Sequence, residues 1–325
     1  MRIAIALAYE GPRSANPRVG CVIIDDEGSE VGSGFHHGAG TPHAEVEALA
    51  VAGERARGAT AVVTLEPCNH TGRTGPCTQA LIDAGIARVV FAQHDPTPKA
   101  SGGAEALRAA GIDVLEGIGL AEAEQINRGW THLQLTGRPY VILKLAQTLD
   151  ARVADADGGP TAISGPQARV LTHGLRAESD AVLVGTATAI ADDPQLTVRE
   201  QQVTSQPLRV VMGERELPDG LRVLDESAPT LLIRHRDPRS ALGLLREHGV
   251  QQVLLEGGPT LASAFLEAEC VDEVIWFLAP SLMGAGVAST HPMSRAFPVD
   301  VTEARLIGND VMVRGRISRS AQGQR

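Results

Sequence analysis

The first hundred residues contain one histidine, two cysteines and a carboxylate whose types and spacing suit zinc chemistry. His43 lies in the sequence Pro-His-Ala-Glu, and Cys68 and Cys77 follow it 25 and 34 residues later. These three residues supply three ligands of a tetrahedral zinc ion and leave the fourth position open to water, which is typical of a catalytic site. Zinc lowers the pKa of its bound water toward neutrality, and the hydroxide attacks a carbon that bears an amino group. Glu45 is then free to take the proton from that water and to deliver it to the departing ammonia.

These residues are predicted to lie at the N-terminal ends of helices. Residues two apart do not share a face within a regular helix. If Pro42 opens the helix, however, His43 and Glu45 surround its N-terminal end and both reach a site beyond that end. Cys77 begins a second predicted helix, where the positive end of the helix dipole favours a thiolate. The alternative is a closed structural zinc site, for which His70 is the nearby fourth ligand.

Two other uses of such a site are weighed against a small-molecule deaminase. A nucleic-acid-editing deaminase shares the His-Ala-Glu chemistry, but such enzymes typically show Pro-Cys-x-x-Cys, whereas eight residues separate Cys68 from Cys77. The net charge of −10 and the 3% of aromatic residues also lack the basic footprint and the stacking surface of a nucleic-acid binder. The sequence therefore predicts no nucleic-acid partner. The other use is a non-enzymatic, zinc-stabilised interaction module, which a Glu45→Gln protein that bound zinc and kept every activity would favour.

Apolar strand-like runs alternate with helical patterns along the chain and indicate an α/β protein with layered sheets. In the first half, the predicted strands are residues 19–24, 59–65 and 88–92, and the predicted helices are residues 43–52, 77–84 and 104–110. A helical stretch from about residue 121 to 135 ends at Thr136-Gly137-Arg138-Pro139, and Gly followed by Pro is typical of a helix end and a domain joint.

The pattern of strands and helices restarts after this joint. The predicted strands are residues 140–145, 181–185, 208–212, 230–233, 252–255 and 273–278. Three predicted helices each begin with proline, at a position where its missing N–H costs nothing, and cover residues 166–175, 238–248 and 259–268. The sequence therefore predicts two α/β domains, residues 1–137 and 138–325.

The composition and the N-terminal sequence limit the class of protein and the cellular compartment that are expected. Hydrophobic residues make up 43% and charged residues 21%, close to an ordinary soluble globular chain. No apolar run approaches the 18 residues of a membrane helix, so no membrane partner is predicted. Residues 1–8 are interpreted as the first helix of a cytoplasmic protein rather than as a signal peptide. Four cysteines do not make a disulfide framework, and Cys21 and Cys270 are expected to be buried small hydrophobes. The polar tail is expected to fray after about Ile317.

The second half carries a different set of chemical groups. The sequence Leu-Leu-Glu-Gly-Gly-Pro-Thr at residues 254–260 predicts a strand, paired glycines and a helix, and the bared backbone N–H groups of such a turn suit a phosphate. Lys99 and Lys144 are the only lysines among 29 basic residues. Lys144 lies inside an apolar strand, which suggests a need for a compact ammonium whose pKa can shift. The usual nucleotide-binding fingerprints, Gly-x-Gly-x-x-Gly after a strand and the Walker loop, are absent.

The segment from Thr64 to Cys77, with residues 16–21 (Asn-Pro-Arg-Val-Gly-Cys) and His36, resembles the deaminase half of the bifunctional riboflavin-biosynthesis deaminase–reductases. The resemblance implies a cytidine-deaminase-like fold that acts on a diaminopyrimidinone carrying a ribose 5-phosphate. The residues that it implies in the substrate pocket are Asn16, His36, His70 and Arg73. The family usually has proline where Gly75 stands, and this difference is expected to loosen the loop without touching a ligand.

Several segments of the second half resemble the reductase half of the same family: residues 141–146, 148–150, 175–177, 187–199 and 256–258. The resemblance implies a dihydrofolate-reductase-like fold that binds NADPH. It implies hydride delivery to C1′ of the ribosylamino group, which opens the sugar to a ribityl chain. Lys144 and Asp192 are the implied catalytic residues. The implied substrate-binding residues are Arg176, Leu196, Arg199 and Glu256. The implied cofactor-binding residues are Ala146, Ala162, Thr188, Asp192, Gly258, Pro259, Thr260, Leu261, Ala262, Ser263 and Ala264.

The departures from the family pattern are concentrated in the second half. Ala162 stands where the family usually has Trp, Ala151 where it has Gly, and Gly213-Glu214 where it often has Asp-Ser. Loss of a Trp removes a large contact surface. The alternative prediction is therefore a deaminase whose second domain binds a phosphorylated ligand or builds the oligomer without reducing anything. By analogy with the family we expect a homo-oligomer, a dimer or tetramer.

Overall fold

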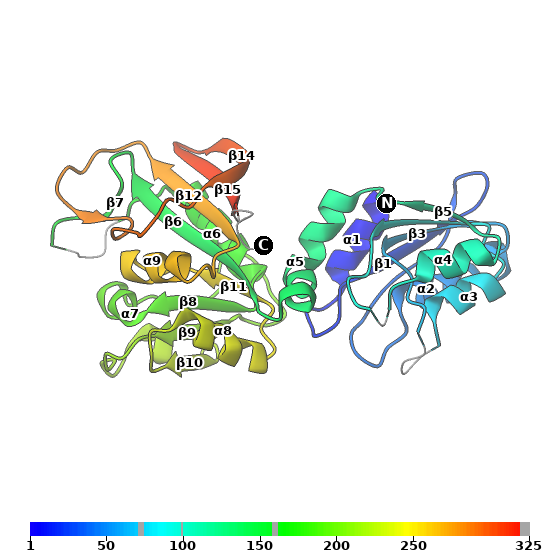
Figure 1. The fold of residues 1–325 in the computed structure, drawn as a ribbon, viewed down its shortest axis with the longest axis horizontal. Helices are drawn as coiled ribbons and strands as arrows, with labels where there is room; N and C mark the ends of the chain where they lie inside the picture. Colours follow the sequence, from blue (N-terminus) through cyan, green and yellow to red (C-terminus); the bar gives the residue numbers. More distant parts are fainter. Residues whose placement is uncertain (71–74, 99, 158–161, 319–325) are drawn as a thin grey trace. The chain divides into compact units, whose positions relative to one another are not determined.

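The computed structural model describes residues 1–70, 75–98, 100–157 and 162–318 (Figure 1). The chain divides into two compact units, Met1–Gly137 and Arg138–Arg325, which are considered one at a time. Arg73 and the tail beyond residue 318, which is expected to fray, lie outside the described residues. Within the described residues, no helix is long and apolar enough to span a membrane.

The first unit is built on a five-stranded sheet in the order β2-β1-β3-β4-β5. Its strands are β1 (Gly20–Ile24), β2 (Glu30–Phe35), β3 (Thr60–Leu65), β4 (Arg88–Gln93) and β5 (Asp113–Glu116). β1 pairs antiparallel with β2 and β3, whereas β3, β4 and β5 are parallel. Apolar side chains such as Ile23, Val63 and Phe91 are fully buried in the core, and Cys21 is buried with them, as predicted.

Helices cover this sheet, with α1 and α5 side by side and α2, α3 and α4 grouped together (Figure 1). They are α1 (Arg2–Glu10), α2 (Ala44–Ala52), α3 (Cys77–Asp83), α4 (Gly103–Ala109) and α5 (Leu120–Thr136), with a 3-10 turn, η1 (Gly53–Ala56). The predicted N-terminal helix is confirmed. Gly20 allows α1 to pack directly on the sheet, because a Cβ there would lie 2.0 Å from the Ala4 carbonyl oxygen.

The second unit is built on an eight-stranded sheet in the order β10-β9-β8-β11-β6-β12-β15-β14. The strands from β10 to β12 in this order are parallel, and β12, β15 and β14 are antiparallel. The strands are β6 (Tyr140–Thr148), β8 (Ala181–Gly185), β9 (Leu208–Met212), β10 (Thr230–Ile233), β11 (Gln252–Leu255), β12 (Glu273–Ala279), β14 (Val299–Ile307) and β15 (Asp310–Ile317). A separate short pair joins β7 (Arg152–Ala154) and β13 (Val287–Ala288).

The helices of the second unit follow the parallel strands, as the alternating pattern predicts. They are α6 (Pro166–Ala177), α7 (Thr186–Asp192), α8 (Pro238–Glu247) and α9 (Pro259–Glu267), with a 3-10 turn, η2 (Arg222–Leu224). α6, α8 and α9 each begin with proline, which confirms the predicted helix starts. In α8 the Asp237 side chain also caps the helix by accepting from the Ser240 N–H at 2.8 Å.

Four strands of the two large sheets were not predicted from the sequence: β2, β5, β14 and β15. β2 contains Gly32 and Gly34, which weaken a strand signal but are needed here, because a Cβ on Gly32 would lie 2.3 Å from the Ala48 carbonyl oxygen of α2. β14 is mostly exposed and mixes charged residues with apolar ones such as Val301 and Leu306, so it lacks the continuous apolar run of a buried strand. The Gly308-Asn309 pair between β14 and β15 is typical of a two-residue hairpin turn and could have revealed both strands.

Candidate functional site

In the first unit, the three predicted metal ligands converge. Their ligand atoms all lie within 4.8 Å of one another, and no other cluster of this kind is found in the described part of the chain. His43 Nδ1 lies 3.1 Å from Cys77 Sγ and 3.6 Å from Cys68 Sγ. His70 is not part of this cluster. Among the described residues, the closed zinc site considered from the sequence therefore lacks its fourth ligand.

Helix ends position the cluster, with one correction to the prediction. Pro42 does not open α2; the helix begins at Ala44, and His43 is its N-cap residue with extended backbone, φ −72° and ψ 160°. This backbone turns the imidazole across the end of the helix rather than along its side. Cys77 is the first residue of α3, as predicted, and its backbone N–H lies 3.4 Å from Cys68 Sγ. The helix N-terminus thus donates directly to a sulfur, which favours the thiolate.

Cys68 is held in place by backbone contacts. Its carbonyl accepts from the Thr78 N–H at 3.2 Å, so the loop after β3 is tied to α3. Gly103, the first residue of α4, packs against this loop from the other side, where a Cβ would lie 1.9 Å from the Pro67 carbonyl oxygen. Any side chain at residue 103 would displace the loop, so close packing as well as spacing positions the sulfur.

The donor set fits a zinc ion. One imidazole nitrogen and two sulfurs are the ligands of catalytic zinc in the Cys2His class. Hydrogen bonds from Cys77 and His43 lower the pKa of Cys68 to about 4, even though burial opposes this. The hydrogen bond to Cys68 and burial raise the pKa of Cys77. The cluster therefore already favours one thiolate, and binding of a metal ion would displace the proton of the second thiol to solvent.

Glu45 lies within the first turn of α2 and is only 3% exposed. Burial raises the pKa of its carboxyl group, which His43 partly offsets. A carboxyl group with a raised pKa exchanges a proton near neutral pH more readily than an exposed one.

Two of the four predicted pocket residues of the first unit lie together beside the cluster. Asn16 Nδ2 is 3.1 Å from His36 Nε2, and His36 Nδ1 is 3.1 Å from the Pro42 carbonyl oxygen. The His36 ring packs edge-on against the ring of His43, with centroids 5.3 Å apart. Burial lowers the pKa of His36, so its ring is favoured as the neutral form. His70 Nδ1 is buried without a hydrogen-bond partner among the described residues.

The second unit contains a cleft of about 1070 Å³ at the carboxyl ends of its parallel strands. This volume lies just above the usual range for small-ligand sites. Most of the predicted reductase residues line it: Lys144, Ala146, Ala162, Arg176, Thr188, Asp192, Leu196, Arg199, Glu256, Gly258, Pro259, Thr260, Leu261 and Ala264. Ala262 and Ser263 do not, because the helical turn of α9 directs Ala262 into the core and Ser263 Oγ accepts from the His291 N–H at 2.9 Å.

Lys144 and Glu256 are brought together by strand pairing. β6 and β11 are parallel neighbours in which Leu143 pairs with Leu255, so the next residue of each strand faces the cleft side by side. Burial lowers the pKa of Lys144, although the neighbouring carboxylate Glu256 opposes this. The Lys144 Nζ also lies 5.8 Å from the centre of the Phe277 ring. Lys144, one of only two lysines in the sequence, therefore lies in the cleft with a lowered pKa.

Arg176 of α6, an implied substrate-binding residue, lines the cleft and is paired with another residue of the site. Its guanidinium forms two hydrogen bonds with the Glu256 carboxylate, at 2.6 and 3.0 Å, and a third to the Thr197 carbonyl at 3.2 Å. Burial alone would raise the pKa of Glu256, but this ion pair overrides burial and lowers it. The first contact of Arg176 is thus a carboxylate of its own chain.

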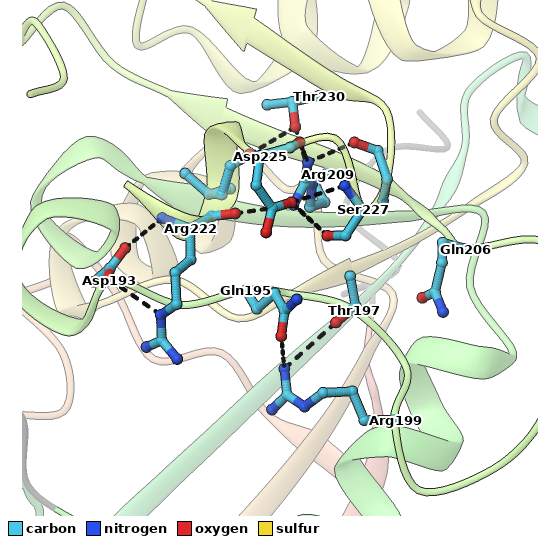
Figure 2. A network of polar contacts seen from close by, with 12 residues as sticks. Asp193, Gln195, Thr197, Arg199, Gln206, Arg209, Arg222, Asp225, Ser227 and Thr230 are labelled. Carbon is cyan, nitrogen blue, oxygen red and sulfur yellow. Dashed lines mark hydrogen bonds and ion pairs between the residues drawn. The ribbon is translucent and has the colours of Figure 1, made fainter. Parts of the chain in front are cut away.

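Residues 192–199 bend sharply along the cleft. Asp192 ends α7, and burial raises the pKa of its carboxyl group. Asp193 and Leu196 have positive φ values of 39° and 56°, so the backbone turns at these two residues. Arg199 donates to Gln195 Oε1 at 3.0 Å and to Thr197 Oγ1 at 3.4 Å (Figure 2). Its guanidinium is held by neutral groups and is exposed.

A buried arginine on β9, which was not predicted from the sequence, holds the segment between η2 and β10 in place (Figure 2). Arg209 is fully buried and donates to Thr230, to the Asp225 carboxylate and to the carbonyl of Arg222. Arg222 in turn donates its backbone N–H and its Nε to the Asp193 carboxylate, at 2.7 and 3.1 Å. Arg209 thus holds the η2 turn against the residue that follows Asp192. A single arginine within an apolar strand was the available signal.

The structure gives a physical reason for one departure from the family pattern, Gly213, and shows that another, Ala151, is unfavourable for its backbone. Ala151 has φ 61°, a left-handed conformation that favours glycine. Gly213 has φ 142°, and a Cβ there would lie 2.7 Å from Thr186 Oγ1, so aspartate does not fit this backbone. Ala162, in contrast, is exposed and lines the cleft, and no feature of the described residues explains the loss of the family's Trp.

Comparison with known proteins follows the same division. The RibD C-terminal domain family matches residues 139–313, and the cytidine and deoxycytidylate deaminase zinc-binding region matches residues 1–93. The riboflavin biosynthesis protein RibD of Mycobacterium tuberculosis H37Rv is 46% identical over 298 residues, 89% of this chain and 86% of that protein. This chain belongs to the RibD family. RibD of Escherichia coli K12 is 44% identical over 323 residues, 88% of each chain.

Solved RibD structures share the whole fold. A structure of Acinetobacter baumannii RibD covers 98% of both chains with a TM-score of 0.84 and 38% identity. The diaminohydroxyphosphoribosylaminopyrimidine deaminase/5-amino-6-(5-phosphoribosylamino)uracil reductase of Thermotoga maritima covers 98% of this chain and 97% of that one, with a TM-score of 0.88 and 33% identity. The predicted fold and family are confirmed: a zinc-binding, cytidine-deaminase-like domain precedes a RibD reductase domain of the NADPH-dependent type.

Proposed function

We propose that this RibD protein catalyses two successive steps of riboflavin biosynthesis. Its first domain hydrolytically deaminates 2,5-diamino-6-(ribosylamino)pyrimidin-4-one 5′-phosphate. Its second domain uses NADPH to reduce the ribosyl group of 5-amino-6-(ribosylamino)uracil 5′-phosphate to ribityl. The observation that carries the proposal is that one chain similar to RibD proteins over nearly nine-tenths of its length contains both an open three-ligand cluster and a separate large cleft.

In the first domain, we assign His43, Cys68 and Cys77 as zinc ligands and Glu45 as the catalytic proton carrier. Zinc held there would supply a water of lowered pKa. Glu45 is buried and follows His43 by two residues in the sequence. Its raised pKa suits a group that accepts a proton and passes it to the departing amino group. The paired side chains Asn16 and His36, packed against His43, are placed to hydrogen-bond the pyrimidine. His70 and Arg73 remain predicted pocket residues.

In the second domain, we assign Lys144 and Asp192 to the reacting centre. NADPH held in the cleft would supply the hydride that C1′ of the ribosyl group takes up. Opening of the sugar breaks the C1′–O4′ bond and leaves an oxygen that needs a proton. Lys144 is suited to provide it, because burial lowers its pKa while Glu256 keeps the charged form accessible. Asp192 has a raised pKa and lines the same cleft, so it is suited to hold a second proton beside the sugar.

The remaining cleft residues are assigned to binding. Arg199 presents an exposed guanidinium to the substrate phosphate, and Leu196 lines the same cleft. Arg176 acts with Glu256, which it holds as a carboxylate facing the substrate. Gly258 and Pro259 open α9 toward the cofactor pyrophosphate. The other assigned cofactor contacts are Ala146, Ala162, Thr188, Thr260, Leu261 and Ala264. We also propose a cytoplasmic homo-oligomer, a dimer or tetramer, which acts on small phosphorylated pyrimidines.

The decisive experiment tests the second step, where the family pattern is less complete. Purified protein is given the deaminated intermediate, 5-amino-6-(ribosylamino)uracil 5′-phosphate, and the NADPH absorbance is followed. We expect consumption that requires both the protein and the intermediate. If NADPH is not consumed by a preparation that actively deaminates, the second domain is a scaffold or reduces a different compound. A protein without deaminase activity at full zinc occupancy would contradict the first assignment.

A further inference from the structure

The cleft of the second domain continues past the glycine turn to the ends of β9 and β10. Met212 and Ile233 pair in the parallel register of these strands, and the Gly213 N–H donates to the Ile233 carbonyl at 2.9 Å. Arg215 and Arg236 each follow one member of this pair by three residues, and both line the cleft. The two arginines therefore come from adjacent strand ends and lie at the same end of the cleft.

These two arginines are available to an anion. Arg215 forms no hydrogen bond or ion pair within the described parts of the chain. Arg236 is paired with Glu214, with Nε and Oε2 3.3 Å apart, but both side chains are largely exposed, at 72% and 61%. Such exposed pairs are weak, so Arg236 is easily recruited by a ligand. Glu214 itself is not among the residues that line the cleft.

The position of this pair separates it from the reacting centre. In the order β10-β9-β8-β11-β6, the strand that leads to the glycine turn, β11, lies between Lys144 on β6 and the two arginine-bearing strand ends. At about 4.8 Å per strand, β9 and β10 lie roughly 10 and 14 Å from β11 across the sheet. The acidic residues that line the described cleft, Asp192 and Glu256, belong to the ends of α7 and β11 rather than to this end.

We propose that Arg215 and Arg236 bind the 2′-phosphate of NADPH and so determine the preference for NADPH over NADH, an inference that rests on the reductase function proposed above. A dinucleotide with its hydride donor near Lys144 and its pyrophosphate at the start of α9 extends its adenosine toward β9 and β10. NADPH and NADH differ there by one phosphate monoester, which suits two guanidinium groups. The 5′-phosphate of the substrate has the same chemistry, but Arg199 is already assigned to it.

The test measures binding rather than turnover. Dissociation constants for NADPH and NADH are determined by nucleotide fluorescence, without substrate, for the native protein, the R215A and R236A single variants and the double variant. Each single variant is expected to weaken NADPH binding about tenfold or more, as a lost charge-assisted hydrogen bond predicts, and to leave NADH binding unchanged. The affinity for 2′,5′-ADP falls in parallel. R234A is the matched control, because Arg234 is exposed on the same segment but does not line the cleft, and it keeps the native preference.

The other outcomes separate the sources of the phosphate. Equal loss of NADPH and NADH binding in the double variant, or no loss of either, overturns the proposal. Loss of ribose 5-phosphate binding with intact NADPH binding also overturns the proposal. It would show that Arg215 and Arg236 bind the 5′-phosphate of the substrate. A native protein that binds neither dinucleotide contradicts the reductase function itself, and deaminase activity in the same preparation shows that this protein is folded.

Discussion

The zinc site and the reductase cleft are built in different ways within one chain. The metal ligands come from residues 43–77, two at the starts of α2 and α3 and one in the loop after β3, and their donor atoms lie within 4.8 Å of one another. The cleft takes its residues from position 144 to position 291 and from the ends of several parallel strands. A compact site depends on a few atoms that cannot be replaced, whereas a broad cleft distributes binding over many contacts. Most departures from the family pattern, Ala151, Ala162 and Gly213 among them, accordingly lie in the second domain, whereas Gly75 in the first domain is not a metal ligand.

Removal of zinc should give the largest difference between the two sites. A chelator that takes the metal should abolish deamination, because no other donor cluster of this type occurs in the described residues. Reduction of supplied intermediate should continue at its native rate. The measurement is both activities against bound zinc, with circular dichroism to show that the first domain remains folded. Deamination by metal-free protein would contradict the ligand assignment.

The Glu45→Ala variant should come next. Loss of the proton carrier should lower the deamination rate about 10³-fold, within the range for general acid–base groups. Zinc content should stay near one ion per chain, because Glu45 is not a ligand. The reductase rate serves as the internal control. A parallel fall in both activities with an intact fold would disprove the independence of the two sites.

The Lys144→Met variant tests the opposite half. Methionine preserves the unbranched apolar stem but cannot donate a proton, so reduction should slow about 10²-fold while deamination is unaffected. Binding of NADPH, measured separately, should change little, since Lys144 is assigned to the substrate. If the variant is as active as the native protein, Lys144 is not the proton donor and Asp192 takes that role.

The Glu256–Arg176 ion pair predicts a pH-dependent stability of the second domain. The folded-state pKa of Glu256 is below its ordinary value of 4.5, so its contribution is complete above that value and is lost as the pH falls through the folded-state pKa. Glu256→Gln should therefore destabilise the domain at pH 7, by about 3 kcal/mol for a largely buried pair. The deficit should shrink toward pH 3. Denaturant unfolding at the two pH values measures it, and a deficit independent of pH would argue against the charge.

The smallest expected effect concerns Ala151. Its φ of 61° costs a side-chain-bearing residue about 1–2 kcal/mol, and glycine removes this cost at the expense of a more flexible unfolded chain. Ala151→Gly should therefore stabilise the second domain by a net of about 0.5–1 kcal/mol, measured by urea unfolding. Ala154→Gly, in the adjacent β7, should have no stabilising effect. A destabilised Ala151→Gly protein would show that the turn is not strained.

The zinc site was predictable from the sequence because its information is local. The types and spacing of His43, Glu45, Cys68 and Cys77 are visible without the fold, and only the role of Pro42 required correction. The strands with continuous apolar runs were predictable for the same reason. The partnership of Arg176 with Glu256 was not, because it joins residues 80 positions apart through the pairing of β11 with its neighbours. Arg209 gave a signal in its strand, but its six acceptors lie between η2 and the start of β10, in a segment whose path no local pattern specifies.

The place of β15 in the second sheet has a consequence for the order of events during synthesis. β15 pairs with β12 and β14 and therefore lies inside the sheet, although it is made after every other strand. Residues 1–137 form their sheet without any later segment. At roughly 5–20 residues per second, about 9–36 s separate the synthesis of residue 137 from that of residue 317. The metal centre can therefore acquire its ion on the ribosome, well before the reductase sheet has its last strand.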